Sequence, residues 1–266
     1  MDKTKSAAVL GAGKRKAMAI AAHPDDIEFM MAGTLMRLGE AGWELHYMNI
    51  ANGCCGSLEH DAQTTAAIRA DEARKAAQIL GAQWYPPLTG DLEVFYNDDL
   101  LRRLAAIIRQ VAPEILLIHS PVDYMEDHMN ACRLAVSAAF ARGMPNYQTD
   151  PPVSPVSQEV TLYHAMPHEL VDGFGDPVKA RMFVDVGDLM ERKRAALSAH
   201  ASQKEWLDVS QGMDSYLKDM EKTTREMGRQ SGMFECAEGW RPHAHMGFCE
   251  RGANPMKDAL GKCFTP

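Results

Sequence analysis

The chain has 266 residues, a formal net charge of −8, and hydrophobic residues at 46% of its positions. That length is enough for one large core, and α/β domains of this size often fold as one unit. The acidic balance argues against a nucleic-acid-binding protein, which would carry a basic stripe, and no stretch approaches the ~20 apolar residues of a transmembrane helix. Six cysteines occur without a C-x-x-C pair, which favours a reduced cytoplasm over a disulfide framework.

Apolar runs at strand and helix spacing alternate along the chain. Small apolar residues over 17–22 predict a buried strand, and the pattern of 28–41 predicts a helix that Gly42 ends. The same patterns predict helices over 64–80, 98–111 and 189–199, and strands over 44–51, 114–118, 160–164 and 181–186. We therefore expect an α/β fold with a Rossmann-like, mostly parallel sheet flanked by helices and a C-terminal strand and helix extension. Residues 1–266 would form a single domain, with 1–16 as a flexible N-terminal flank.

The last long helix carries an apolar stripe at helical spacing. The stripe is formed by Met213, Tyr216, Leu217, Met220 and Met227. Such a stripe is typical of core packing or of a subunit contact, so we do not expect a ligand site on this helix.

His23-Pro24-Asp25-Asp26 follows the first predicted strand directly. In open α/β sheets, ligands bind at the carboxyl ends of the strands. One imidazole and two carboxylates crowded there are costly unless a cation pairs with them, and a divalent metal is the simplest such cation. A helix cap would explain one aspartate but not the histidine and the second aspartate.

A second group of acidic residues and histidines, from His119 to His128, follows the strand over 114–118. Asp127 in this group can cap the helix that comes next. Parallel strands end at the same edge of a sheet, so the two groups would face one another. Together they predict a metal site formed by a histidine, an aspartate and a second histidine.

These motifs resemble the PIG-L or LmbE-like zinc-dependent de-N-acetylases. The similarity covers roughly residues 17–205 in order and also includes Gly33-Thr34-Leu35, Asn52-Gly53, Gly56-Ser57, Arg69 with Glu72, Ile79-Leu80-Gly81 and His200-Ala201-Ser202-Gln203. The resemblance implies that His23, Asp26 and His128 bind the metal, which would be Zn²⁺ or another divalent ion. Asp25 would be the general base that takes a proton from the metal-bound water, whose pKa can fall to about 7, and later gives it to the leaving amine.

The chain departs from this family at the residue three positions before the last histidine ligand. The family usually has a histidine there, held by an aspartate two positions later; this chain has Met125, although Asp127 remains. A thioether cannot donate a hydrogen bond, and a tetrahedral oxyanion normally needs a second donor. His243 and His245 could supply it, because alternate residues share a strand face. The alternative is that both imidazoles are solvated at a strand edge. Cys54 also stands where the family commonly has an aspartate.

Two residues are candidates for substrate binding. Arg69 could hold hydroxyls or carboxylates through its guanidinium fork, although an ion pair with Glu72 one turn away is the alternative. Asp91 lies in a loop where the family places a sugar-binding acid.

The sequence therefore predicts a metal-dependent hydrolase that removes an N-acetyl or other N-acyl group from an amino sugar or glycoconjugate, with Asp25, Asp127, His243 and His245 as catalytic residues. The alternative is a metal-dependent hydratase or lyase acting on a small unsaturated carboxylate, because the oxalomesaconate hydratases resemble this family and use the same scaffold. A non-catalytic binding module would need the metal ligands but not Asp25. We expect a cytoplasmic homo-oligomer that acts on a small molecule, an N-acetylated sugar, and binds neither nucleic acid nor membrane.

Overall fold

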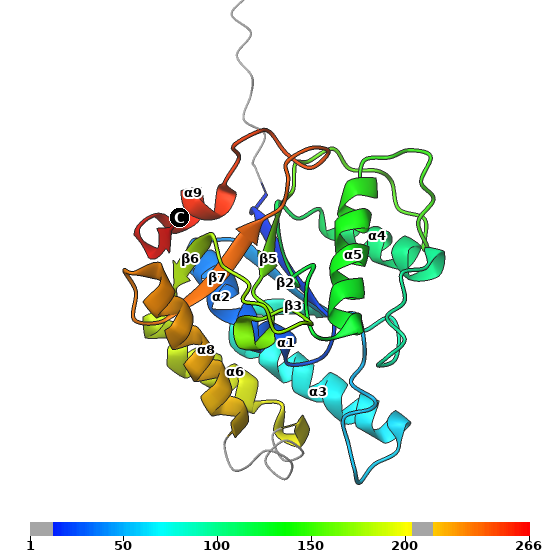
Figure 1. The fold of residues 1–266 in the computed structure, drawn as a ribbon. Coiled ribbons are helices and arrows are strands. Elements are labelled where there is room, and N and C mark those ends of the chain that lie inside the picture. Colours follow the sequence, from blue (N-terminus) through cyan, green and yellow to red (C-terminus); the bar gives the residue numbers. More distant parts are fainter. Residues whose placement is uncertain (1–12, 204–214) are drawn as a thin grey trace, which may run out of the picture.

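The computed structural model describes residues 13–203 and 215–266 (Figure 1). Within them, eight strands form one sheet in the order β3-β2-β1-β4-β5-β7-β6-β8. The N-terminal part of this sheet is parallel and consists of β1 (Lys16–Ala21), β2 (Glu44–Asn49), β3 (Ala82–Tyr85), β4 (Ile115–Ile118) and β5 (Thr161–Ala165). The expected Rossmann-like and mostly parallel sheet is confirmed.

The C-terminal part of the sheet is antiparallel. β7 (Ala237–Pro242) pairs in this sense with β5 and with β6 (Met182–Asp185), and β8 (Phe264–Thr265) pairs with β6. β7 therefore runs opposite to β1 and β4, and its carboxyl end lies at the other end of the sheet from theirs. In Figure 1 the chain leaves β1 at the lower end of the view, whereas β7 points upward.

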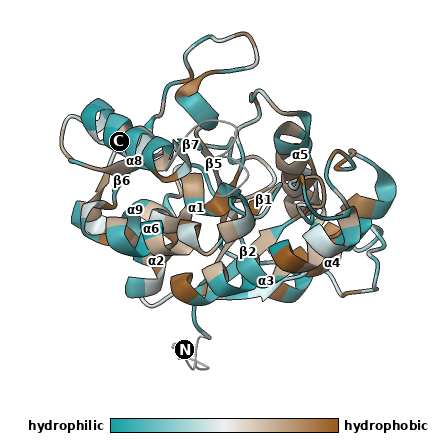
Figure 2. Ribbon diagram, turned by 90° about the horizontal axis from the view of Figure 1, so that it is seen from below, coloured by the Kyte–Doolittle hydropathy of each residue, from teal (hydrophilic) through white to brown (hydrophobic). Residues whose placement is uncertain are grey.

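Helices cover both faces of the sheet. They are α1 (Asp26–Met30), α2 (Ala32–Glu40), α3 (Ala62–Leu80), α4 (Asp98–Val111), α5 (Glu126–Ala141), α6 (Met190–Ser198), α8 (Ser215–Ser231) and α9 (Pro255–Leu260). Short 3₁₀ turns lie at His168–Leu170, Gly187–Leu189 and Gly261–Cys263. Hydrophilic and hydrophobic segments alternate along α3 and α4 in Figure 2, as expected for helices with one face on a core. None of the described helices is long and apolar enough to cross a bilayer.

Two hydrophobic cores lie on opposite faces of the sheet, because successive side chains of a strand alternate between its faces. Ala17, Ala19 and Ala21 of β1 belong to the core under α2, α3, α6 and α9. The intervening residues, Met18 and Ile20, belong to the core under α4 and α5. Both faces of β1 are therefore dry, which explains why its sequence is a continuous apolar run.

Three local predictions differ from the structure. The helix predicted over 28–41 is two helices, α1 and α2, which meet at Met31. Asp127 does not cap α5; Met125 occupies the N-cap position and Asp127 lies in the first turn. Lys16, predicted as part of the flank, belongs to β1. The rest of that flank up to residue 12, and Met213 of the apolar stripe, lie outside the described residues.

A buried ion pair ties the antiparallel part of the sheet to α2. Glu238 of β7 accepts hydrogen bonds from the backbone N–H groups of Gly33 and Thr34, at 2.8 and 2.7 Å, in the first turn of α2. Lys193 of α6 lies 2.5 Å from the same carboxylate, and its side chain is fully buried. Because each charge has a partner, the pair can be buried, and it fixes α2 and α6 around the site described next.

Candidate metal centre and active-site cavity

A cavity of about 410 Å³ opens at the carboxyl ends of β1 and β4. This is the end of the sheet at which α/β proteins bind ligands. Of the site residues predicted from the sequence, the described lining includes His23, Asp25, Asp26, Arg69, Asp91 and His128. The loops after the parallel strands therefore bring the two sequence motifs together.

His23, Asp26 and His128 place one potential ligand atom each within 4.8 Å of one another. Asp26 lies between the two imidazoles: Oδ2 is 3.6 Å from Nδ1 of His23, and Oδ1 is 3.4 Å from Nε2 of His128. Two nitrogen ligands and one oxygen ligand with an open fourth position are the donor set of a catalytic zinc site.

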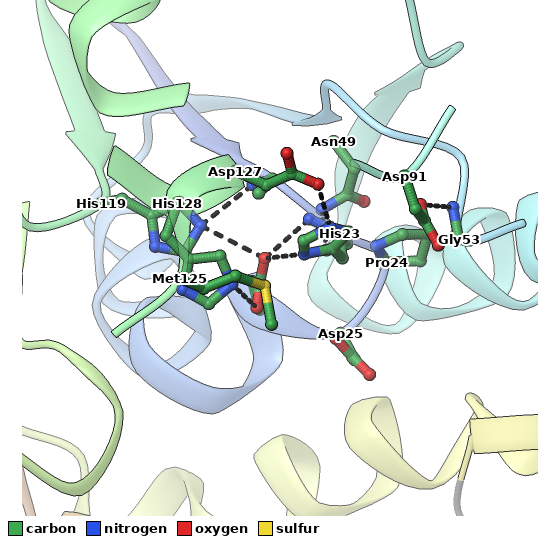
Figure 3. A network of polar contacts seen from close by, with 12 residues as sticks. His23, Pro24, Asp25, Asn49, Gly53, Asp91, His119, Met125, Asp127 and His128 are labelled. Carbon is green, nitrogen blue, oxygen red and sulfur yellow. Dashed lines mark hydrogen bonds and ion pairs between the residues drawn. The ribbon is translucent and has the colours of Figure 1, made fainter. Parts of the chain in front are cut away.

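Each imidazole of this trio is oriented by a second carboxylate. Asp127 Oδ2 lies 2.9 Å from Nε2 of His23 (Figure 3), and Asp123 Oδ1 lies 3.0 Å from Nδ1 of His128. With one ring nitrogen donating to a carboxylate, the other nitrogen of each ring presents its lone pair toward Asp26. The residues present therefore fit a divalent metal ion.

Asp127 has a different role from the one predicted. Besides His23, its carboxylate accepts a hydrogen bond from the backbone N–H of Leu92 at 2.7 Å. It thus joins the loop before α4 to His23, and it does not hold the residue at position 125. The sequence indicated that Asp127 holds another side chain of the site, but not that this side chain is His23.

The electrostatics of the trio favour a bound cation. Burial alone would lower the pKa of His23, but hydrogen bonds to Asp127 and Asp26 outweigh it and raise the pKa to about 9. Burial also opposes the charge on His128, but Asp26 and Asp123 raise its pKa to about 10. Burial would raise the pKa of Asp26, yet the neighbouring imidazoles hold it well below its usual value. The cluster therefore attracts positive charge, whether as protons or as a metal ion.

His119, which directly follows β4, contacts both Asp26 and His128 of this cluster. Its Nε2 accepts a hydrogen bond from the Ala22 N–H at 2.9 Å and lies 3.2 Å from Asp26 Oδ2. Its ring stacks on His128 with centroids 4.2 Å apart. Burial lowers the pKa of His119, which keeps the ring neutral beside the others.

Asp25 occupies the N-cap position of α1 and has a strained backbone. Its φ of 108° lies in the left-handed region, which costs a non-glycine residue roughly 1–3 kcal/mol and persists only where the surroundings impose it. The side chain makes no hydrogen bond to the start of α1, so capping does not account for this carboxylate. In Figure 3 its carboxylate points away from His23 and His128. Burial raises the pKa of Asp25, and the positive charge of Arg69 partly offsets this.

Arg69 is buried and binds the chain around Asp25. Its guanidinium donates to the Pro24 carbonyl, to Gln203 Oε1 and, at 3.3 Å, to Asp25 Oδ2. The alternative pairing with Glu72 is wrong, because Glu72 instead accepts hydrogen bonds from the N–H and hydroxyl of Ser202, at 2.8 and 2.7 Å. Arg69 lines the cavity, where a substrate could reach it. Its contact with substrate remains a prediction.

Asp91 shapes the loop that follows β2. Its two carboxylate oxygens accept hydrogen bonds from the backbone N–H groups of Gly53 at 2.7 Å and Cys55 at 2.9 Å. Gly53 has a φ of 77°, a conformation that glycine adopts without strain. Asp91 also lines the cavity, and sugar binding by this residue remains a prediction.

His243 and His245 are not brought to the cavity. β7 ends at Pro242, so the argument that the two residues share a strand face is wrong. Nδ1 of His243 lies 2.9 Å from Nε2 of His164, and neither His243 nor His245 is among the described residues that line the cavity. The physical reason is the direction of β7, which carries the chain away from the carboxyl ends of β1 and β4.

The structure places other residues where those two histidines were expected. Met125 does face the cavity, close to His23 and His128 (Figure 3). Beside it, the Tyr124 ring lies 5.6 Å from that of His128 and 6.0 Å from that of His168. His168 follows β5, the next parallel strand, so the rule that located the other site residues would also have selected it.

The sequence analysis did not identify Tyr216 and Gln203 as cavity residues, for a different reason. Both line the cavity from the C-terminal part of the chain, Tyr216 from α8 and Gln203 from the segment after α6. Tyr216 was assigned to the apolar core stripe, and nothing in its spacing distinguishes a cavity-facing phenol from a packed one.

Comparisons with known proteins identify relatives of this chain. Residues 18–140 match the family model described as PIG-L: GlcNAc-PI de-N-acetylase. A diacetylchitobiose deacetylase from Thermococcus kodakarensis is 28% identical over 196 residues, which cover 71% of this chain and 70% of that protein. A 4-oxalmesaconate hydratase from Pseudomonas putida is 29% identical over 199 residues, covering 72% of this chain and 75% of that protein.

Solved structures share the fold. The N,N'-diacetylchitobiose deacetylase from Pyrococcus horikoshii has a TM-score of 0.73 at 24% identity, covering 86% of this chain and 84% of that one. The 4-carboxy-2-hydroxymuconate hydratase from Pseudomonas putida has a TM-score of 0.72 at 24% identity, covering 90% of this chain and 99% of that one. One scaffold therefore underlies two chemistries among the relatives.

Proposed function

Because this chain belongs to the PIG-L family, we propose that it is a zinc-dependent hydrolase that removes an acetyl group from an amino sugar or a related glycoconjugate. One observation carries this function. His23, Asp26 and His128 converge at the floor of a cavity that Asp25 also lines, which gives a metal site with a separate carboxylate beside it. The deacetylase relative, which acts on an acetylated amino sugar by its name, supports the choice of substrate class.

Each of these residues has a separate role in the proposed hydrolysis. A divalent metal held by His23, Asp26 and His128 would supply a Lewis acid that activates water and polarises the amide carbonyl. Asp25 takes a proton from the attacking water and delivers it to the amide nitrogen as the C–N bond breaks. Asp127 and Asp123 hold the two imidazoles in the tautomers that binding requires.

A hydrogen-bond donor for the developing oxyanion is also needed, and Met125 cannot provide one. Tyr124 and His168 are the donors that the structure places on this side of the cavity. Burial raises the pKa of the Tyr124 phenol well above neutrality, so its hydroxyl keeps the proton to donate.

Hydration of an unsaturated carboxylate is the second candidate, and the hydratase relative at 29% identity favours it. The charge of the cavity counts against it. Apart from the imidazoles that would hold the metal, the described lining carries the carboxylates of Asp25, Asp26, Asp91, Asp123 and Asp219 against the guanidinium of Arg69, which is paired with Asp25. A divalent ion would offset only part of this negative charge, so a substrate with several carboxylates would be repelled.

The proposed function is tested by measuring amine release from N-acetylated sugars and glycoconjugates with the zinc-loaded protein. Asp25→Asn should keep the metal content but lower turnover by roughly 10²–10⁴-fold, the usual contribution of a general base. Wild-type turnover in this variant would show that another group is the base. Addition of water to an unsaturated acid without any amine release would overturn the deacetylase function and support the hydratase.

A further inference from the structure

Asp25 receives two donors on the same carboxylate oxygen. Oδ2 accepts the hydroxyl proton of Tyr216 at 2.7 Å and lies 3.3 Å from Nη2 of Arg69. Among the described residues, none donates a hydrogen bond to Oδ1. The described residues therefore hold one oxygen of a carboxylate that lines the cavity.

The local chain does not by itself determine where this carboxylate points. Asp25 follows a proline, has a φ of 108°, and makes no capping hydrogen bond. Its neighbour Asp26 is engaged by imidazoles, whereas the Asp25 side chain turns away from them in Figure 3. The contacts with Tyr216 of α8 and Arg69 of α3 thus account for its direction.

Both donors are themselves fixed. Tyr216 is 4% exposed, and its ring packs edge-on against Phe29 with centroids 5.1 Å apart. Arg69 is 2% exposed; its Nη2 also donates to the Pro24 carbonyl, and its Nη1 donates to Gln203 Oε1. Tyr216 and Gln203 lie beyond residues 18–140, the segment that matches the family model. Part of the support of Asp25, namely Tyr216 and the Gln203 that holds Arg69, is therefore contributed by the C-terminal part of this chain.

From these contacts we infer that Tyr216 is a positioning residue for Asp25. Its hydroxyl, together with Arg69, clamps Oδ2 and so fixes the position of the carboxylate in the cavity. The inference rests on the proposed role of Asp25 as the base. A base must lie within hydrogen-bond reach of the proton that it abstracts, and a displacement of about 1 Å can reduce turnover by ~10²-fold.

A double-mutant cycle tests this role with the zinc-loaded, full-length protein. Tyr216→Phe should lower kcat by roughly 10- to 100-fold, with KM and metal content unchanged, because only the orientation of the base is lost. In the Asp25→Asn background the same change should have no further effect, since there is no base left to position. Tyr163→Phe is the matched control: its buried hydroxyl donates to Asn254 Oδ1 at 2.9 Å, away from the cavity, and kcat should be unchanged.

Three results would overturn the inference. They are a wild-type kcat in Tyr216→Phe, a loss of kcat on Tyr216→Phe that is as large in the Asp25→Asn background as in the wild type, and an equal loss in Tyr163→Phe. The second of these would mean that Tyr216 acts on the substrate and not through Asp25.

A crystal structure of Tyr216→Phe separates this inference from the proposed function. The Asp25 carboxylate should leave its present position or become disordered when the phenol oxygen is removed. If it keeps its position, Tyr216 does not hold it, whatever reaction the enzyme catalyses. If it moves but the wild-type protein releases no amine from any acetylated sugar, the clamp stands and the deacetylase function fails.

Discussion

His23 and His128 lie at the carboxyl ends of parallel strands, whereas His164 and His243 meet where β5 runs beside antiparallel β7. Histidines come together in both places, and three of these four rings are largely buried. Their protonation differs in sign. The pKa of His23 is raised to about 9 and that of His128 to about 10, whereas burial lowers the pKa of His164 to about 4. Burial alone therefore does not make a cation site.

Carboxylates account for the difference. Asp26, Asp123 and Asp127 contact the first pair at 2.9–3.6 Å. His164 has a backbone carbonyl, a thiol and another imidazole around it, and no described carboxylate forms an ion pair with it. A neutral imidazole in such surroundings stabilises packing, while an imidazole between carboxylates can exchange its proton for a metal.

Replacing one histidine of each pair by alanine should give the largest difference in metal occupancy. The purified protein should hold about one divalent ion, by preference zinc. His23→Ala or His128→Ala should lose most of it and with it most activity, whereas His243→Ala should retain it. Elemental analysis after dialysis measures the occupancy. Full stoichiometric metal in both His23→Ala and His128→Ala would show that neither residue is a ligand.

Removing the carboxylates should have the next largest effect. Asp127→Asn or Asp123→Asn leaves the ligands in place but weakens their orientation, so metal affinity should fall by about 10- to 100-fold. Competition with a chelating dye measures the affinity. Asp99→Asn, at an exposed residue of α4, is the control and should bind metal as the wild type does. Unchanged affinity in both site variants would mean that the histidines are oriented by packing alone.

The two pairs should also affect stability in opposite directions as pH changes. In metal-free protein the raised pKa values of His23 and His128 give a stabilisation that is complete below about pH 6.5 and lost as pH rises through 9 to 10. His164 acts the other way: its pKa near 4 makes the folded state less stable as pH falls from about 6.5. Thermal unfolding of the metal-free protein should therefore show a loss of stability at alkaline pH that bound metal reduces. Identical alkaline slopes with and without metal would contradict this.

The sequence was sufficient for the parallel half of the protein. A continuous apolar strand followed at once by histidine and aspartate places polar groups at a strand end, and the right-handed alternation of strands and helices puts such ends together. This located His23, Asp26 and His128, and the same rule applied to β5 would have added His168.

The antiparallel half could not be inferred in the same way. The apolar pattern of β7 is the same whether the strand runs up or down the sheet, so the pattern gave no sign that His243 would leave at the far end. The hydrogen bond from the phenol of Tyr216 could not be inferred either, because its partner Asp25 is 191 residues away in the sequence. Local spacing carries no information on such contacts.

The smallest effect is expected from the two histidines that the sequence analysis named as oxyanion donors. If His243 or His245 donated to the oxyanion, alanine at that position would lower turnover by roughly 10²–10³-fold. The structure instead places His243 against His164 and neither residue among the described residues that line the cavity, so we expect both variants to keep a turnover close to that of the wild type. His168→Ala, at a histidine that does line the cavity, should lower kcat by more than either. These rates can be compared in one amine-release assay at matched zinc occupancy. A loss of 10²-fold or more in His245→Ala alone would show that this imidazole enters the cavity of a second subunit, because within its own chain it does not line one.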